Sequence, residues 1–221
     1  MLRNLNVLTF EYQIREETVL FEQEPEELRR MLNGTVEILA SISRNIDPHT
    51  ARHQLRVARL ACEIGKKLGL SEEQIYGLRV IGMVHDIGKM ALPDEILSKP
   101  GELSEDEFNI VKTHPRLAYD ILKNLDFPWP VAQTVLQHHE RVDGSGYPNQ
   151  LIGHDIILEA RILCVADVIE SMSSDRPYRP APGLHKALAE IEMNSGLLYD
   201  PEVTDACYRM SRNGGIKFDW E

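Results

Sequence analysis

Residues 85–89 have the sequence His-Asp-Ile-Gly-Lys and follow an apolar run, Leu78 to Val84, whose composition predicts a buried helix. A histidine beside an aspartate is costly to bury in apolar surroundings unless both side chains have partners. A metal ion can be that partner, because it accepts imidazole nitrogen and carboxylate oxygen as ligands together. The pair alone does not show that a metal is bound, since a hydrogen-bonded core histidine next to a solvated aspartate would have the same sequence.

Further candidate ligands lie on other segments of the chain, at His53, His114, His138, His139 and Asp167. A single helix cannot supply so many nitrogen and oxygen ligands to one site, whereas several helices can direct them into the core of a bundle. The distribution therefore predicts an all-α fold with a metal site in its core.

Apolar residues at intervals of three or four predict helices along most of the chain. Asp47-Pro48 predicts the start of a helix that ends at Gly69. Ser71 predicts the start of the next helix, which would deliver residues 85 and 86 and be broken at Gly88. Residues 2–21 alternate loosely in polarity and predict either short strands or a linker. The other expected helices cover residues 28–45, 104–113, 114–122, 131–137, 156–169, 185–193 and 201–210.

The composition narrows the class of protein. The 221 residues, 43% of them hydrophobic, are enough for one well-buried domain with a small extension. The net charge of −11 argues against binding to polymeric nucleic acid or to an anionic membrane, so an anionic substrate would need metals or local cations. We expect a cytoplasmic protein, because the sequence has no apolar membrane span, no secretory signal and only three scattered cysteines.

Several candidate residues have a plainer interpretation when each is taken alone. His49 and His53 lie four residues apart on one face of the predicted helix, where a capping or surface histidine is common. His138 and His139 could be surface residues, although side chains about 100° apart on a helix would suit two neighbouring metals. Asp167 has apolar neighbours, and this favours a ligand because a carboxylate in that setting is seldom unpaired.

Two loops are expected near these candidates. Residues 143–148, Asp-Gly-Ser-Gly-Tyr-Pro, follow the histidine pair and predict a tight loop, because glycine, proline and aspartate favour turns. A plain turn without a functional role is the alternative. Arg176 and Arg179 follow Asp167 in another predicted loop, where they could bind phosphate in a bidentate manner or remain ordinary surface residues.

Taken together, these segments make the chain resemble the HD-GYP family, a branch of the HD superfamily of metal-dependent phosphohydrolases. The resemblance extends over about residues 45–205, and its long Gly-Tyr-Pro motif is very specific. It implies an all-α HD-domain bundle in residues 28–210, preceded by an extension or linker in residues 1–27 and followed by a tail in residues 211–221. The matching segments are DPHTARH at 47–53, HDIGK at 85–89, KPG at 99–101, HP at 114–115, HHERVDGSGYP at 138–148 and VADVIESMSSDRPYR at 165–179.

The resemblance also implies an activity and a set of site residues. The activity is hydrolysis of a cyclic dinucleotide, usually cyclic di-GMP, at two or three iron or manganese ions. The product is linear pGpG, and whether it is hydrolysed further to GMP is left open. Asp86 would bridge two metals, and Lys89 would lie beside the attacked phosphate. Tyr147, Asp143 and Gly146 would belong to the substrate pocket, and Arg176 and Arg179 would approach the phosphates or guanines. The metal ligands carried over by position are His53, His85, Asp86, His114, His138, His139 and Asp167.

The chain departs from the family pattern at a few positions. Ala118 stands where the family usually has glycine, and Glu170-Ser171 replaces a more usual Asp-Ala; neither departure is expected to touch the ligands. His49 stands where many members have tyrosine and the three-metal type has glutamate. We expect His49 to bind a third metal. The alternatives are a hydrogen bond to substrate phosphate, or a side chain that merely fills the place of the usual tyrosine.

Two other functions stay open. One is a signalling or interaction module with an inactive site, although the complete ligand set argues against it. The other is hydrolysis of a different substrate, such as cyclic GMP-AMP or a linear dinucleotide, because the sequence does not distinguish guanine from adenine recognition. An upstream sensor or receiver domain and a homodimer are both compatible with the sequence.

Overall fold

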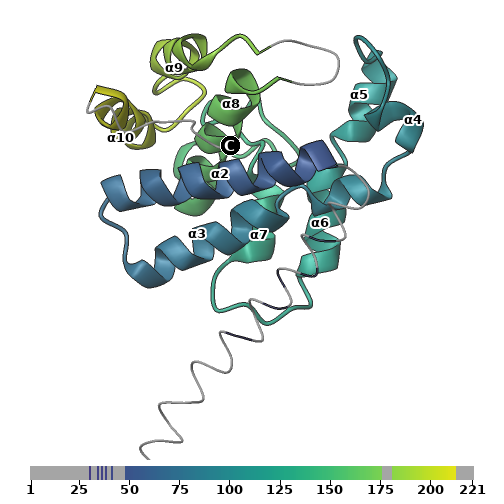
Figure 1. Ribbon diagram of the computed structural model, residues 1–221, viewed down its shortest axis with the longest axis horizontal. Helices are drawn as coiled ribbons and strands as arrows, with labels where there is room; N and C mark the ends of the chain where they lie inside the picture. Colours follow the sequence, from purple (N-terminus) through teal and green to yellow (C-terminus); the bar gives the residue numbers. More distant parts are fainter. Residues whose placement is uncertain are drawn as a thin grey trace, which may run out of the picture. The chain divides into compact units, whose positions relative to one another are not determined.

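The computed structural model describes residues 48–175 and 181–212, together with residues 30, 34, 36, 38 and 41. The chain divides into two compact units, residues 1–39 and residues 40–221, and all the helices with defined bounds belong to the second. The described residues form helices and no strands, which confirms the all-α prediction (Figure 1). Among the described helices, none combines the length and the apolar character needed to cross a bilayer.

The observed helices agree closely with those expected from the sequence. The α-helices are α2 (Pro48–Lys67), α3 (Glu72–Val84), α4 (Asp94–Leu97), α5 (Glu105–Val111), α6 (His114–Leu122), α7 (Val131–Gln137), α8 (Leu158–Ser173), α9 (Leu184–Met193) and α10 (Pro201–Arg212). Two short 3₁₀ helices are η1 (Ile87–Ala91) and η2 (Gly153–Asp155). The expected helix over residues 28–45 falls mostly outside the described residues, and the division of the chain at residue 28 stays a prediction.

Helices α2 and α3 form a closely packed pair (Figure 1). The turn between them uses Gly69 at φ +78°, and the Ser71 side chain accepts a hydrogen bond from the backbone of Gln74 in a capping box at the start of α3. A Cβ added to Gly82 would lie 2.4 Å from the Cα of Ala58. The helices approach each other at this point because both residues are small, and the contact fixes the end of α3.

The end of α3 differs from the sequence prediction. The helix stops at Val84, so His85 and Asp86 follow it and are not inside it. Gly88 lies in η1, where an added Cβ would be 2.0 Å from the carbonyl oxygen of His114 and 2.6 Å from the amide nitrogen of Ala118. Glycine is therefore required for the contact between η1 and α6, and this contact brings His114 close to Asp86.

Helix α8 is the central helix of the second unit and packs against α2, α7, α9 and α10 (Figure 1). Its apolar side chains Ile162, Leu163, Val165 and Ile169 are completely buried. The helix begins two residues later than expected, because Ile157 is extended and its amide donates a hydrogen bond to the Gln137 side chain. Asp167 therefore belongs to a helix that is fixed in the core on several sides.

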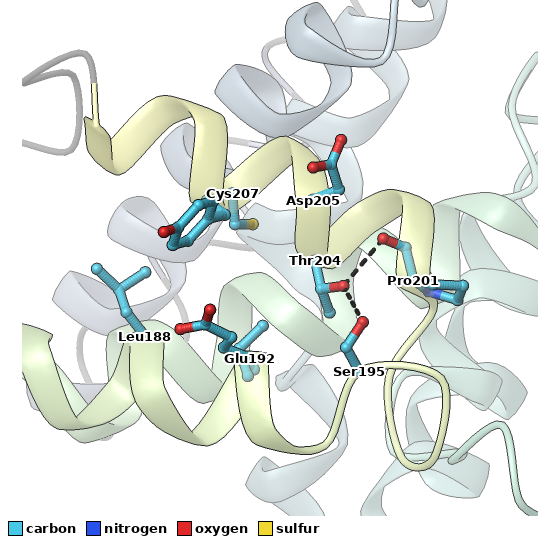
Figure 2. Close-up of a pocket in the computed structure, with 9 residues that line it drawn as sticks. Leu188, Glu192, Ser195, Pro201, Thr204, Asp205 and Cys207 are labelled. Carbon is cyan, nitrogen blue, oxygen red and sulfur yellow. Dashed lines mark hydrogen bonds between the residues drawn. The ribbon is translucent and has the colours of Figure 1, made fainter.

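A pocket of about 190 Å³ lies between α9 and α10 (Figure 2). Its wall includes Leu188, Ile191 and Tyr208, and the Thr204 hydroxyl makes hydrogen bonds with the Ser195 hydroxyl and the Pro201 carbonyl. The lining contains none of the residues predicted to form the site. The predicted site residues described by the structure therefore lie elsewhere in the bundle.

Candidate metal centre

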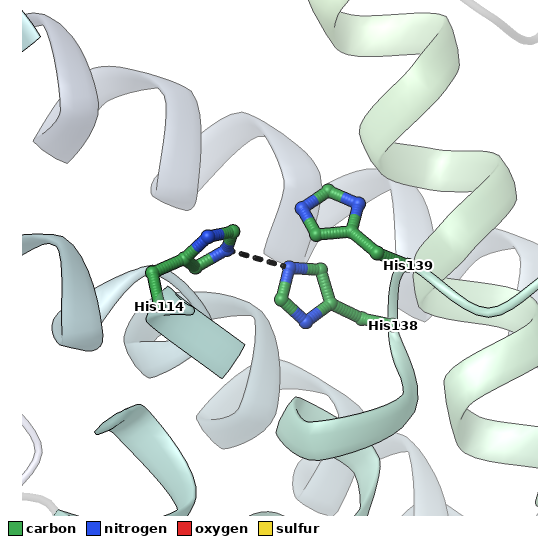
Figure 3. Close-up of side chains that lie close together, drawn as sticks. All are labelled: His114, His138 and His139. Atoms are coloured by element: carbon green, nitrogen blue, oxygen red, sulfur yellow. Dashed lines mark hydrogen bonds between the residues drawn. The ribbon is translucent and has the colours of Figure 1, made fainter. Parts of the chain in front are cut away.

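The predicted ligands come together in the core from five separate parts of the chain. Six of them form two groups of three, and within each group the potential ligand atoms lie within 4.8 Å of one another. One group comprises His53 from α2 with His85 and Asp86 from the end of α3. The other comprises His114 at the start of α6 with His138 and His139 just after α7 (Figure 3).

Asp86 lies between the two groups. Its Oδ1 is 3.4 Å from Nε2 of His114, whereas its Oδ2 is 3.7 Å from Nε2 of His53 and 3.5 Å from Nε2 of His85. The Nζ atom of Lys89 is 2.6 Å from Oδ2. Each carboxylate oxygen thus faces a different group. This arrangement would allow the Asp86 side chain to bind a metal ion in each group.

Asp167 extends the first group. Its Oδ1 is 3.0 Å from Nε2 of His53. In the second group, Nε2 of His114 and Nε2 of His138 lie 3.4 Å apart. Figure 3 shows the two rings facing each other. The fold therefore places in one cluster all seven ligands that the family resemblance carries over by position.

The hydrogen bonds of three histidines show which nitrogen can bind a metal. The Nδ1 atoms of His85, His114 and His138 lie 2.8, 2.8 and 2.6 Å from backbone carbonyl oxygens three residues earlier. A carbonyl oxygen can only accept, so Nδ1 carries the proton and the lone pair is on Nε2. Nε2 of His85 is buried and has no hydrogen-bond partner among the described residues. This orientation fits a metal ligand, because metal-binding histidines usually donate their other nitrogen to such a partner.

The electrostatics of the cluster agree with this donor set. Burial, with His85 as a further cause, lowers the pKa of His138 to about 3, and burial also lowers that of His114 to about 4. Burial would also lower the pKa of His53, but the carboxylates of Asp167 and Glu170 outweigh it and raise the value to about 9. His53 would then release a proton on binding a metal, since only neutral imidazole is a ligand.

Asp86 is ionised in spite of its burial. Burial alone would raise its pKa, but the Lys89 ammonium and the neighbouring histidines hold the pKa well below its usual range. Neutral imidazoles and ionised carboxylates around one site are the donor set that a divalent transition metal prefers. The residues present therefore fit the metal centre that the fold family implies.

The loop after the histidine pair is held by a glutamate that the sequence interpretation did not single out. Glu140 is 1% exposed, and its two carboxylate oxygens accept the amides of Asn149 and Leu151 at 2.7 and 3.1 Å. These bonds close the loop on which Tyr147 lies. The sequence did contain a signal, because Glu140 directly follows two candidate ligands. Its hydrogen bonds to the loop can be seen only in the folded structure.

The loop residues predicted to bind substrate have different surroundings. The Tyr147 ring packs against the His139 ring with centroids 4.8 Å apart, so Tyr147 borders the cluster. Asp143 accepts the amide and hydroxyl of Ser145 and thereby stabilises the turn. An added Cβ on Gly146 would lie 2.4 Å from the Cα of Glu140, so Gly146 permits close packing of the loop. Their contacts to a substrate remain predictions.

One expectation from the sequence is wrong. Glu170 and Ser171 were expected not to touch the ligands, but the Glu170 carboxylate contacts Nδ1 of His53. The Ser171 hydroxyl also donates to Oδ1 of Asp167 at 3.3 Å. Both residues lie on the same helix as Asp167, within one turn, and so they reach the ligands from α8. The backbone amide of Ala118 lies close to Gly88, and Ala118 is not one of the candidate ligands.

Three predicted site residues cannot be placed in this way. Arg176 and Arg179 lie outside the described residues. The backbone of His49 belongs to the first turn of α2, as expected, but its side chain is outside the described part of the structure.

The sequence and the fold are similar to those of known proteins. A family model for the HD domain matches residues 37–203. The cyclic di-GMP phosphodiesterase response regulator RpfG of Xanthomonas campestris pv. campestris is 43% identical over 178 residues, which cover 78% of this chain and 47% of that protein. A cyclic di-GMP phosphodiesterase of Thermotoga maritima is 39% identical over 188 residues, which cover 84% of this chain and 51% of that protein.

A relative with a different named substrate is similar too. The 3'3'-cGAMP-specific phosphodiesterase 3 of Vibrio cholerae is 39% identical over 155 residues, which cover 70% of this chain and 34% of that protein. The structure of a cyclic GMP-AMP specific phosphodiesterase of Vibrio cholerae has a TM-score of 0.63 at 21% identity and covers 84% of this chain and 51% of that chain. The chain thus spans about half the length, or less, of the curated relatives it matches.

Proposed function

The chain belongs to the HD domain family, in its HD-GYP branch, and from this membership we propose that it is a metal-dependent phosphodiesterase that hydrolyses a cyclic dinucleotide. The observation that carries the proposal is the position of Asp86 between two groups of candidate ligands. Such an arrangement suits two neighbouring metals acting on one phosphodiester. The names of the relatives favour cyclic di-GMP as the substrate, with cyclic GMP-AMP as the second candidate.

We propose that the centre holds iron or manganese. His53, His85 and Asp167 would hold one ion, the group of His114, His138 and His139 the other, and Asp86 both. The chemistry that such ions supply is polarisation of the phosphodiester and activation of water. They would also provide the positive charge that attracts an anionic substrate, which the protein itself lacks at a net charge of −11.

The remaining site residues would orient the substrate and stabilise charge. Lys89 is 24% exposed and would neutralise charge that develops on the phosphoryl oxygens. Tyr147, packed on His139, would form the pocket wall beside the metals. We also propose that the domain acts in the cytoplasm. We further propose that a sensor or receiver region regulates it, because one relative is named a response regulator.

A substrate panel tests the proposal. Anaerobically prepared protein loaded with Mn²⁺ or Fe²⁺ is incubated with cyclic di-GMP, 3'3'-cGAMP, cyclic di-AMP and linear pGpG, and the products are separated by chromatography. Cleavage of cyclic di-GMP to pGpG is expected, and the pGpG sample shows whether the reaction continues to GMP. Protein treated with a chelator is the control. Metal-loaded protein that cleaves no member of the panel would instead support an interaction module.

Arg176 and Arg179 should affect substrate binding more than catalysis. Arg176→Ala and Arg179→Ala are each expected to raise KM about tenfold while kcat changes less, because a charge-assisted bond to phosphate contributes roughly 1.5–3 kcal/mol. Steady-state kinetics with cyclic di-GMP measures both constants. Arg209→Ala is a suitable control, since Arg209 forms an exposed ion pair with Asp205 on α10. An unchanged KM in both variants would identify Arg176 and Arg179 as ordinary surface residues.

We further propose that His49 binds a third metal. It lies one helical turn before His53 in α2, and residues four apart share one face of a helix. Elemental analysis of anaerobically prepared His49→Ala should therefore give about two metals per chain where the wild type gives about three, with basal hydrolysis retained. His154→Ala, which removes an exposed histidine, is the control. Equal metal content in wild type and His49→Ala would favour a contact of His49 with the substrate.

A further inference from the structure

We infer that Glu170 is the positioning residue of the metal centre: its carboxylate fixes the His53 imidazole so that Nε2 faces Asp86 and Asp167. The inference rests on the proposed function, in which His53 is a metal ligand. Glu170 stands where the family pattern usually has aspartate, which has a shorter side chain.

Both oxygens of Glu170 are engaged in the core. Oε2 contacts Nδ1 of His53, whereas Oε1 accepts Nε of Arg56 at 2.5 Å and the Ser174 hydroxyl at 2.7 Å. Only 1% of the Glu170 surface is exposed. Because Arg56 and Ser174 hold one oxygen, the carboxylate cannot rotate freely, and the other oxygen keeps its place against His53.

His53 needs such a partner because of its place in α2. His85, His114 and His138 each follow the last turn of a helix, namely α3, α5 and α7. The last carbonyl oxygens of these helices have no partner within the helix and can accept from Nδ1. His53 lies in the second turn of a 20-residue helix, where the preceding carbonyls are used by the backbone. A side chain from another helix must therefore fix its tautomer, and the fold provides Glu170 from α8.

Helix α8 contacts both nitrogens of His53 with one face. Asp167 and Glu170 are three residues apart and thus lie on the same side of the helix. Asp167 Oδ1 is 3.0 Å from Nε2, while Glu170 contacts Nδ1. An ionised acceptor on Nδ1 also increases the basicity of Nε2, which strengthens a metal bond. The Glu170 carboxylate can act on the metal only through His53, since the described structure records no contact between Glu170 and any other candidate ligand.

The test measures metal affinity at each of the two groups separately. Wild type, Glu170→Gln and Glu170→Asp are titrated anaerobically with Mn²⁺ against a competing chelator. His53→Ala and His114→Ala show which binding step belongs to which group. Glu190→Gln is the matched control, because Glu190 is also a hydrogen-bonded glutamate but contacts Asn194 and Tyr199. Thermal unfolding of the metal-free proteins is recorded in parallel.

In Glu170→Gln we expect Mn²⁺ to bind roughly 10–100-fold more weakly in the binding step that His53→Ala abolishes. A loss of this size is typical when the hydrogen-bond partner of a metal ligand is removed. The step lost in His114→Ala should keep its wild-type affinity. Glu170→Asp, which retains the charge, should lie closer to wild type. Unchanged affinities in Glu170→Gln, or equal weakening of both steps together with a lower melting temperature, would overturn the inference while leaving the proposed function intact. Wild-type protein that binds no Mn²⁺ would overturn both.

Discussion

Asp86→Ala should have no measurable phosphodiesterase activity and should contain fewer metal ions than the wild type. The Asp86 carboxylate directs Oδ1 at His114 and Oδ2 at His53 and His85, so its removal takes one ligand atom from each group. A loss of at least about 10³-fold in kcat/KM is expected, because metal-ion catalysis contributes several kcal/mol to transition-state stabilisation.

The chain offers a matched control for this variant. Asp120 forms an ion pair with Lys123 at 2.6 Å, with the same spacing of three residues and the same distance as the pair of Asp86 with Lys89. The Asp120 side chain is 49% exposed, however, whereas that of Asp86 is 2% exposed. Asp120→Ala should therefore retain activity and metal.

Elemental analysis and initial rates with the preferred cyclic dinucleotide decide between the possible outcomes for Asp86. Full activity in Asp86→Ala would contradict the proposal that the centre holds two metals. Low activity with the wild-type metal content would mean that the two groups do not share Asp86 as a ligand.

The helices could be predicted because their signals are local. The capping pairs of Ser71 with Gln74 and of Ser104 with Glu107 are present as expected, and α6 and α7 have the predicted bounds. Candidate ligands could also be named from the sequence, since histidines and aspartates on apolar segments need partners. All seven are found in one cluster, and their ligation of metal remains a proposal.

The tertiary contacts could not be predicted from local patterns. Gly88 was interpreted as a helix breaker, whereas its role depends on the distance to the His114 carbonyl in another helix. Glu170 is 117 residues from His53 in the sequence, and its substitution for the usual aspartate gave no indication that the two side chains meet. Comparison with a family pattern identifies a departure, but only the folded positions show what the departing residue touches.

Lys89→Ala should lower kcat by about 10²–10³-fold with a metal content close to that of wild type, an effect similar to the loss of an oxyanion donor. The Lys89 side chain is 24% exposed, so its ammonium group lies at the boundary of the buried cluster, where a phosphate could approach. A cation at this place would stabilise the negative charge that grows on the phosphoryl oxygens.

The same geometry permits a second role for Lys89, since its Nζ lies 2.6 Å from Oδ2 of Asp86 and could simply hold that carboxylate in place. Metal content distinguishes the two roles, because a misplaced Asp86 would weaken metal binding, whereas loss of transition-state stabilisation would not. Lys123→Ala controls for the removal of an equivalent but exposed ion pair. If Lys89→Ala loses metal in parallel with kcat, Lys89 supports Asp86; if kcat alone falls, the ammonium group acts on the substrate.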